Sequence, residues 1–150
     1  MNPRHQAREA ALQILYFCEV AHAPADVAME AFFREHAPEA SEPTRAFAEQ
    51  LVRGTLADAT ELDALIAAHS QNWRLERLAT IDRLILRLAS WELQQGPDSP
   101  PAVVMDEALE LARTFSSDGS VAFVNGVLDA VRRSVRGEAR EAPRKRRPRA

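Results

Sequence analysis

The sequence predicts an all-α protein of six or seven helices. Apolar residues recur at the three- and four-residue spacing of amphipathic helices along several proline-free segments. No segment alternates apolar and polar residues as a half-buried strand does. The nine prolines fall between the periodic segments rather than inside them. With 150 residues, 46% of them apolar, the chain has the size and composition of one domain with one sizeable core.

The first half of the chain predicts three helices. Residues 4–22 place Ala, Ile, Leu and Cys side chains on one face, and a turn at 23–26 separates them from a shorter helix over 27–36. After a proline-containing loop, Thr44 is expected to cap one long helix that continues to about Ser70. This long helix is supported by apolar residues at helical spacing, namely Phe47, Leu51, Leu62, Leu65 and Ile66.

The second half predicts a short helical piece over 73–78 and then three longer helices. The first runs over 81–95 and stops at a Gly-Pro pair, and the second opens at Pro101 and ends at Phe115. A turn follows, Ser120 is expected to cap the last helix, and Gly126 within it suggests a close approach of another helix. Trp73 and Trp91 are expected to pack between helices.

Charge divides the chain into a body and a tail. Residues 137–150 carry six basic and two acidic side chains, a net charge of +4. The remaining residues carry 13 basic and 20 acidic side chains, a net charge of −7 within the −3 of the whole chain. We therefore expect a globular helical domain over 1–136 and a flexible basic tail over 137–150. An acidic body argues against a protein that coats nucleic acid generally.

Motifs for catalysis and for cofactor or metal binding are missing from the sequence. It has no glycine-rich phosphate loop, a single cysteine and four scattered histidines with no zinc-ligand spacing. We therefore expect no catalytic activity, no cofactor and no metal. No apolar run reaches the roughly 18 residues of a membrane span, and the N-terminus does not resemble a secretion signal, so we expect a cytoplasmic location without membrane contact.

Several stretches in a fixed order resemble one known family. They are residues 4–16, residues 47–54, residues 75–93 and the segment 101–129, which contains E-A-x-E-L-A-x-x-F followed by F-V-N-G-V-L-D. Together they closely resemble the NusB family of bacterial transcription antitermination factors, over residues 4–136. Each stretch alone is a weak signal, and their combination is highly specific.

The resemblance implies two small helical subdomains and a function in RNA-dependent transcription. Family members bind the boxA element of nascent ribosomal RNA leader transcripts together with NusE, a small-subunit ribosomal protein. The pair assembles on RNA polymerase and suppresses premature termination of ribosomal RNA transcription. Some members self-associate, so a homodimer is also among the states that the resemblance allows.

The resemblance also implies which residues contact RNA. For an N-terminal arginine-rich segment, the matching positions are Arg4, His5 and Arg8. Further candidates around the start of the last helix are Phe115, Ser116, Phe123 and Asn125. Arg4 and Arg8 are four residues apart, so they share a helix face from which they can reach successive phosphates. An aromatic ring at a helix end, as at Phe115, can stack on an unpaired base. The alternatives stay open: the arginines can simply solvate a first helical turn, and Phe123 can belong to the core.

For the protein partner NusE, the family surface matches Tyr16, Glu76 and Asp82. An exposed tyrosine beside carboxylates suits a basic ribosomal protein, because the ring anchors and the charges steer. The net charge of the body agrees with this interpretation. The alternative is that Tyr16 covers the edge of the core and the acids solvate the surface.

Two other functions compete with RNA binding at this stage. One is a protein-only adaptor, since the arginines of residues 4–8 are sparse. The other is an isolated domain related to the N-terminal module of ribosomal RNA cytosine methyltransferases. The basic segment 137–150 adds nonspecific RNA affinity in one interpretation and only solubility in the other.

Overall fold

The computed structural model describes residues 2–70, 78–96 and 99–146, with side chains up to residue 135, and within them it has seven α-helices and no strand. The predicted all-α class is confirmed. The helices are α1 (Pro3–Ala21), α2 (Ala25–His36), α3 (Glu42–Ala57), α4 (Ala59–His69), α5 (Thr80–Gln95), α6 (Pro101–Phe115) and α7 (Asp118–Arg146). Apart from Leu78, the helix predicted over 73–78, with Trp73, lies outside the described residues.

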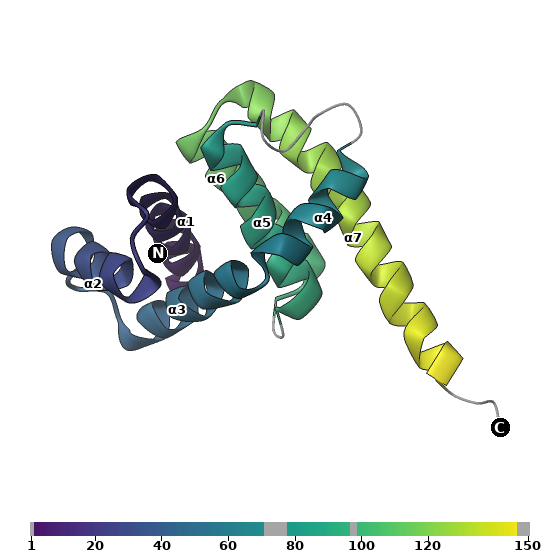
Figure 1. The fold of residues 1–150 in the computed structure, drawn as a ribbon, viewed down its shortest axis with the longest axis horizontal. Helices are drawn as coiled ribbons and strands as arrows, with labels where there is room; N and C mark the ends of the chain where they lie inside the picture. The colour runs from purple at the N-terminus through teal and green to yellow at the C-terminus, as the bar shows by residue number, and fades with distance from the viewer. Residues whose placement is uncertain (1, 71–77, 97–98, 147–150) are drawn as a thin grey trace.

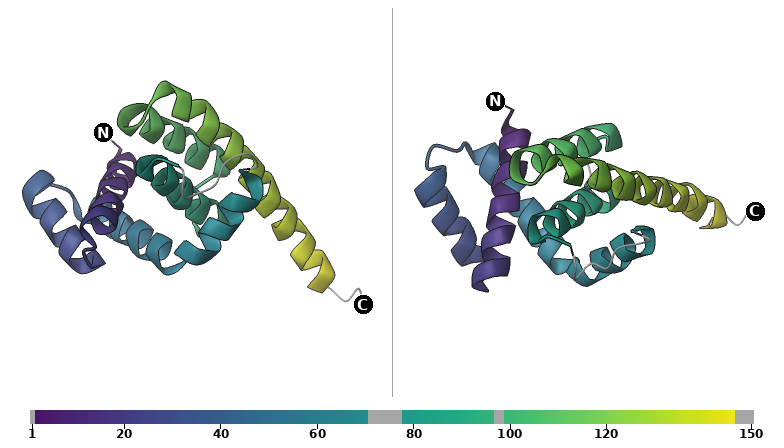
Figure 2. Two further views of the ribbon diagram at one scale, coloured as in Figure 1. Left: turned by 45° about the horizontal axis from the view of Figure 1, so that its top comes forward. Right: turned by 90° about the horizontal axis from the view of Figure 1, so that it is seen from above.

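The helices form two groups that share one core (Figure 1). In the first group α1 packs against α2 and α3, and in the second α5 contacts α4, α6 and α7. Helix α5 also packs against α1 and α3, so the apolar side chains of both groups form a single cluster. Figure 2 shows α7 running along the second group and extending beyond it at its C-terminal end. The arrangement agrees with the two subdomains that the family resemblance implies.

Short polar side chains begin two of the N-terminal helices. The Asn2 side chain accepts a hydrogen bond from the Arg4 backbone N–H at 2.8 Å, and Pro3 occupies the first helical position, where its missing N–H costs nothing. Helix α3 begins in the same way at Ser41, whose hydroxyl accepts from the Thr44 backbone N–H at 3.3 Å. The prediction that Thr44 is the cap was therefore wrong by three residues. The two prolines next to these caps start a helix rather than interrupt one.

The single long helix predicted from Thr44 to Ser70 is instead two helices. The break falls at Asp58, which ends α3 and precedes α4. Its backbone N–H still bonds to the Gly54 carbonyl, but its φ of −103° and ψ of 16° leave helical geometry. Aspartate is a weak helix former that favours helix ends, so the turn occurs there. Apolar residues continue at helical spacing on both sides of Asp58, so the spacing alone did not predict the break.

Helices α3 and α5 approach closely where Gly54 faces Trp91. A Cβ atom added to Gly54 would lie 2.2 Å from Cζ2 of the Trp91 ring, so only glycine fits this position without movement. Trp91 is buried, as the sequence analysis predicted for an interhelix tryptophan. The contact joins the first helical group to the second.

Helix α7 differs from its prediction at three points. The Ser117 hydroxyl accepts from the Ser120 backbone N–H at 3.2 Å, so Ser117 and not Ser120 caps the helix. A Cβ on Gly126 would meet nothing within 4 Å, so the expected close helix approach there was wrong. The backbone stays helical to Arg146, past the predicted end near Gly137. No helix in the described part of the chain combines the length and apolar character needed to span a membrane.

Candidate functional site

The residues predicted to contact RNA lie in two clusters near opposite ends of α1. Arg4, His5 and Arg8 are in its first turns, and Phe115 and Ser116 are at the end of α6, near the C-terminal half of α1. We call the first group, with Glu92, Ser99 and Glu107, the arginine cluster. At 1.5 Å per residue, Arg4 and Tyr16 are roughly 18 Å apart along the axis. The structure therefore separates residues that the sequence analysis had grouped together.

Arg8 lies inside the protein, at the centre of the arginine cluster. Its Nε and Nη2 donate to the two carboxylate oxygens of Glu92 at 2.8 and 2.9 Å, and both side chains are 3% exposed. Because Arg8 is on α1 and Glu92 is on α5, this pair bridges the two helices. The expectation that Arg8 shares an exposed, phosphate-facing surface with Arg4 was wrong. A buried guanidinium needs a carboxylate partner, and the fold provides Glu92.

Arg4 lies one turn earlier and is partly exposed. Its Nη1 donates to the Ser99 hydroxyl at 3.1 Å, and Arg8 Nη2 donates to the same oxygen at 3.0 Å. Its guanidinium carbon is 4.5 Å from the centre of the Phe47 ring, and that of Arg8 is 5.4 Å from it. Both distances are in the range of cation–π contacts. The two arginines therefore share one acceptor and one aromatic ring.

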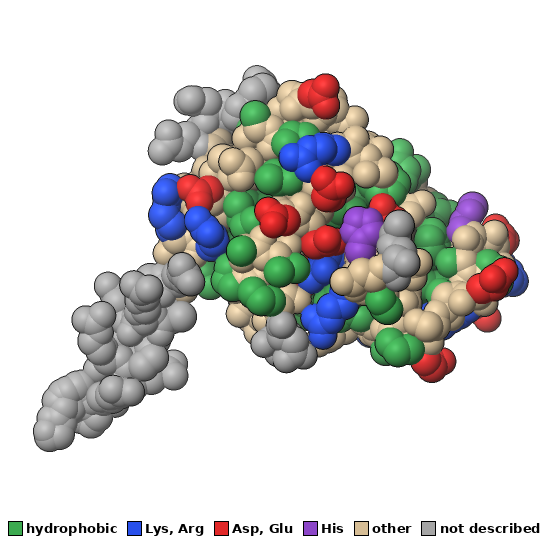
Figure 3. Space-filling view, turned by 180° about the vertical axis from the view of Figure 1, so that it is seen from behind, with side chains coloured by type: hydrophobic (Ala, Val, Ile, Leu, Met, Phe, Trp, Pro, Cys, Tyr) green, Lys and Arg blue, Asp and Glu red, His purple; other side chains and the backbone are tan. Residues whose placement is uncertain are grey.

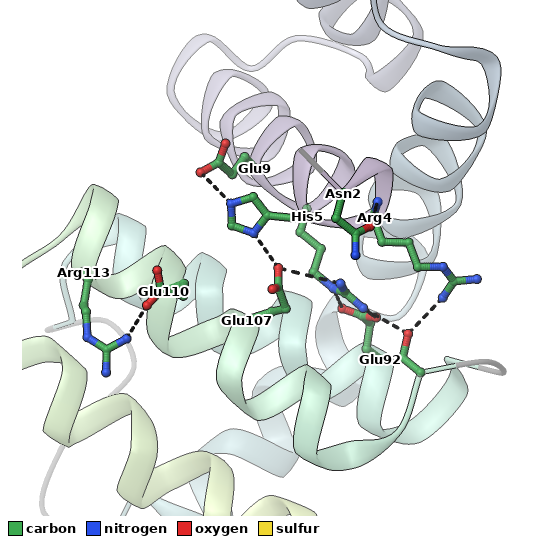
Figure 4. A network of polar contacts seen from close by, with 10 residues as sticks. Asn2, Arg4, His5, Glu9, Glu92, Glu107, Glu110 and Arg113 are labelled. Atoms are coloured by element: carbon green, nitrogen blue, oxygen red, sulfur yellow. Dashed lines mark hydrogen bonds and ion pairs between the residues drawn. The ribbon is translucent and has the colours of Figure 1, made fainter.

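His5 joins α1 to α6 beside these arginines. Its Nδ1 is 2.8 Å from a Glu107 carboxylate oxygen, and its Nε2 is 3.3 Å from Glu9 (Figure 4). The hydrogen bond to Glu107 raises the pKa of His5 above its ordinary value, with a further rise from the nearby charges of both carboxylates and a partial offset from burial. The protonated ring can donate to both acids at once.

An apolar groove of about 390 Å³ lies at the other end of α1. Its lining includes Tyr16 and Phe17 from α1, Phe32 from α2, Ile81 from α5 and Phe115 from α6. Tyr16 and Phe17 are 42% and 43% exposed, so the exposure expected of Tyr16 is confirmed. Phe115, predicted to stack on RNA, thus faces the same groove as Tyr16, predicted to bind a protein.

Asp82 is only 8% exposed, so the expectation that it presents a surface charge beside Tyr16 was wrong. It lies in the first turn of α5, where its two carboxylate oxygens accept hydrogen bonds from Ser116 and Ser120, each at 2.7 Å. The carboxylate thereby ties the start of α5 to the α6–α7 turn. We call this arrangement the Asp82 clasp.

The other predicted residues lie around the clasp or outside the described part. Phe123 is partly buried and lines a small hollow beside Asp82. Asn125 is exposed on α7. Glu76 lies outside the described residues.

One face of the molecule does not have the character of a uniform phosphate-binding surface. Figure 3 shows the side opposite to that of Figure 1, where acidic and basic side chains are interspersed with apolar patches. Within the described residues, no group of three or more His, Cys, Asp or Glu side chains is arranged to hold a metal ion.

Comparison with known proteins identifies the family. The model of the NusB family matches residues 5–133, which is most of the chain. The chain belongs to the NusB family. A transcription antitermination protein NusB from Solibacter usitatus is 44% identical over 135 residues, covering 90% of this chain and 92% of the relative. The corresponding protein of Bacillus subtilis is 42% identical over 132 residues, covering 88% of this chain and 96% of the relative.

Solved NusB structures share the fold. A NusB structure from T. maritima superposes with a TM-score of 0.81 at 30% identity, covering 89% of this chain and 92% of that chain. A chain from a crystal structure of the antitermination factors NusB and NusE in complex with dsRNA gives a TM-score of 0.82 at 25% identity, covering 89% and 98%. The family resemblance stated from the sequence is thereby confirmed.

The sequence analysis missed the partners of α1 that organise the arginine cluster, namely Phe47, Glu92, Ser99 and Glu107. One signal was present. Glu92 follows Leu88 by one helical turn on the apolar face of α5, and Arg8 follows Ala7 on the buried face of α1. An acid and a base that each interrupt an apolar helix face are candidates for a buried pair. Ser99 and Phe47 have no comparable signal.

Proposed function

We propose that this chain is a transcription antitermination factor that binds boxA RNA of nascent ribosomal RNA leader transcripts together with NusE. The observation that carries the proposal is the match to curated antitermination proteins over about nine tenths of the chain. The likeness to a NusB chain solved with NusE and dsRNA supports RNA and NusE as its partners. The role is noncatalytic and cytoplasmic, as part of an assembly on RNA polymerase.

On this proposal the two ends of α1 have different partners. Arg4 and His5 contact RNA, since they are the partly exposed basic side chains of the arginine cluster. Tyr16 and Phe17 contact NusE, because large, partly exposed rings beside an apolar groove are the usual anchors of a protein interface. The net charge of −7 outside residues 137–150 favours a basic protein partner.

In this proposal, residues around the Asp82 clasp also contact RNA, although they lie beside the groove that binds NusE. Ser116, Phe123 and Asn125 contribute RNA contacts from the α6–α7 turn and the first turns of α7, next to the groove. Asp82 acts on both surfaces by holding this turn rather than by direct contact, because its oxygens already bind Ser116 and Ser120.

A mobility-shift titration at fixed salt tests the function. The probes are a boxA-containing ribosomal leader RNA and a scrambled RNA of the same composition, each with and without the cognate NusE. We expect selective retention of the boxA probe and tighter binding when NusE is present. Equal, weak retention of both probes with and without NusE contradicts the proposal.

A protein-only adaptor remains the second candidate, and one observation favours it. The burial of Arg8 removes one of the two arginines that the sequence offered for phosphate contact in α1. An adaptor would bind NusE with the same affinity whether or not boxA RNA is present. Substituting Arg4→Glu separates the two functions, because it abolishes RNA retention in the first and changes nothing in the second.

A further inference from the structure

We propose that Ser99 and Phe47 are positioning residues for RNA binding, and that they hold the Arg4 guanidinium in the orientation in which it meets a phosphate. This inference rests on the proposed function, in which Arg4 contacts RNA. It assigns Arg8 a different role, as the buried residue that fixes Ser99 in place without touching RNA.

The arrangement begins with the buried pair. The Arg8 guanidinium is held against the Glu92 carboxylate by two hydrogen bonds of 2.8 and 2.9 Å. A forked pair of this kind sets direction as well as distance. Its remaining Nη2 proton points at the Ser99 hydroxyl, 3.0 Å away. The Ser99 oxygen, just before α6, is therefore located by a group that is itself buried and bonded on two sides.

Ser99, held in place by Arg8, in turn restrains the position of the Arg4 guanidinium. A hydroxyl oxygen has two acceptor positions, so it can accept from Arg8 and Arg4 together. Arg4 Nη1 makes the second of these bonds at 3.1 Å. The Phe47 ring supports the same guanidinium from one face, with its centre 4.5 Å from the Arg4 guanidinium carbon. An edge and a face of the group are thereby both constrained by the protein.

Such constraint matters because arginine is a long side chain. An unconstrained arginine loses much of its rotamer freedom when it binds a phosphate, and this loss weakens binding. A guanidinium already held on a ring and a hydroxyl has lost that freedom on folding. Ser99 and Phe47 therefore raise RNA affinity through Arg4, although neither residue carries charge.

A double-mutant cycle in the intact chain tests the inference, with affinity for the boxA leader RNA as the measurement. We expect Arg4→Ala to weaken binding about tenfold and to reduce the slope of log K against log salt by about 0.7, the contribution of one phosphate contact on a single strand. Ser99→Ala should weaken binding about threefold while leaving the salt slope unchanged, because the charge of Arg4 is kept.

The decisive result is the coupling between the two sites. In the background of Arg4→Ala, we expect the Ser99→Ala and Phe47→Leu substitutions to have no further effect on RNA affinity. A purely structural role for Ser99 or Phe47 predicts the same loss in both backgrounds, and that result overturns the inference. Thermal unfolding of each variant confirms that the chain is folded at the assay temperature.

Phe33→Leu is the matched control for Phe47→Leu. Phe33 also lies beneath an arginine guanidinium, with Arg45 4.8 Å from its ring centre, but it is on α2 and takes no part in the arginine cluster. We expect its substitution to leave RNA affinity unchanged. Absence of boxA binding by the unsubstituted chain overturns the proposed function and this inference with it. Selective binding that Ser99→Ala leaves unchanged overturns this inference alone.

Discussion

The two ends of α1 differ in how deeply their charged side chains are buried and in how much apolar surface they leave exposed. At the N-terminal end, buried and partly buried charges join α1 to α5 and α6, through Arg8 with Glu92 and His5 with Glu107. At the C-terminal end, the ion pair of Glu19 with Arg83 of α5 is more exposed, and Tyr16 and Phe17 leave a large part of their rings in solvent beside an apolar groove. A charge pair constrains direction, whereas apolar surface does not, so the first end suits orientation of a ligand-binding group and the second suits docking of a protein.

The largest effect should come from breaking the buried pair. Glu92→Ala removes both forked hydrogen bonds of the buried Arg8 guanidinium and leaves Glu107, 3.8 Å away, as its nearest carboxylate. We therefore expect the free energy of unfolding to fall by about 3 kcal/mol in urea titrations, the lower end of the range for a broken buried pair. The matched control is Glu49→Ala, which removes one partner of an exposed arginine, Arg53, and should change little.

Replacing both members of the pair sharpens this test. Arg8→Met combined with Glu92→Leu removes both charges while keeping apolar volume, so it should recover most of the lost stability. A double variant as unstable as Glu92→Ala would show that the direct electrostatic attraction, and not the uncompensated charge, accounts for the loss.

The Asp82 clasp, near the C-terminal end of α1, should contribute less to the free energy of unfolding than the buried pair does. Asp82→Ala removes the acceptor of two serine hydroxyls, and we expect a loss of about 2 kcal/mol in the same titration. The serines keep access to each other, since their hydroxyl oxygens are 2.9 Å apart, which moderates the cost. If Asp82→Ala destabilises as much as Glu92→Ala, the contrast between a buried charge pair and a carboxylate bonded to neutral hydroxyls does not hold.

The third effect is smaller and depends on pH. The folded protein raises the pKa of His5 above the ordinary value of 6.5, so this contribution to stability is complete below that value. It is lost as pH rises through the folded pKa, because the neutral ring no longer attracts Glu107 and Glu9. The free energy of unfolding should therefore fall with pH just above 6.5, and the fall should be weaker in His5→Gln. Identical slopes for the two proteins would contradict a role for His5.

The smallest effect on stability should come from the exposed rings. Tyr16→Ala and Phe17→Ala remove side chains that are already half in solvent, so we expect changes of about 0.5 kcal/mol in unfolding. Their effect on NusE affinity should be tenfold or more, measured by calorimetry, if these rings are anchors of the interface. A large stability loss with unchanged NusE affinity would place them in the core instead.

Most of the fold followed from helical periodicity, because an apolar face has to be buried whatever packs on it. The extents of α1, α2, α5 and α6 were predicted closely for this reason. The break at Asp58 was not, since the apolar spacing continues through it and only the path of the chain requires a turn.

The candidate site was less predictable, because exposure depends on what another helix brings. Arg8 follows Arg4 by one turn of the first helix, and the sequence alone does not distinguish their exposure. Arg8 is buried because Glu92, from a helix far along the chain, pairs with it. In the same way, the sequence alone suggests that Asp82 is a surface acid, whereas in the structure the serines of the α6–α7 turn donate hydrogen bonds to it. The helix holding each residue was predictable, and its bonding partner was not.

The contact of Gly54 with Trp91 restricts the motion of the two helical groups relative to each other. The chain passes from the first helical group to the second at Asp58, one turn beyond Gly54, where a hinge would be expected. The indole ring packed against the α3 backbone prevents the two groups from rotating there without emptying the space it fills. Amide hydrogens in the middle of α3 and of α5 should therefore exchange with deuterium together, in one cooperative unfolding unit.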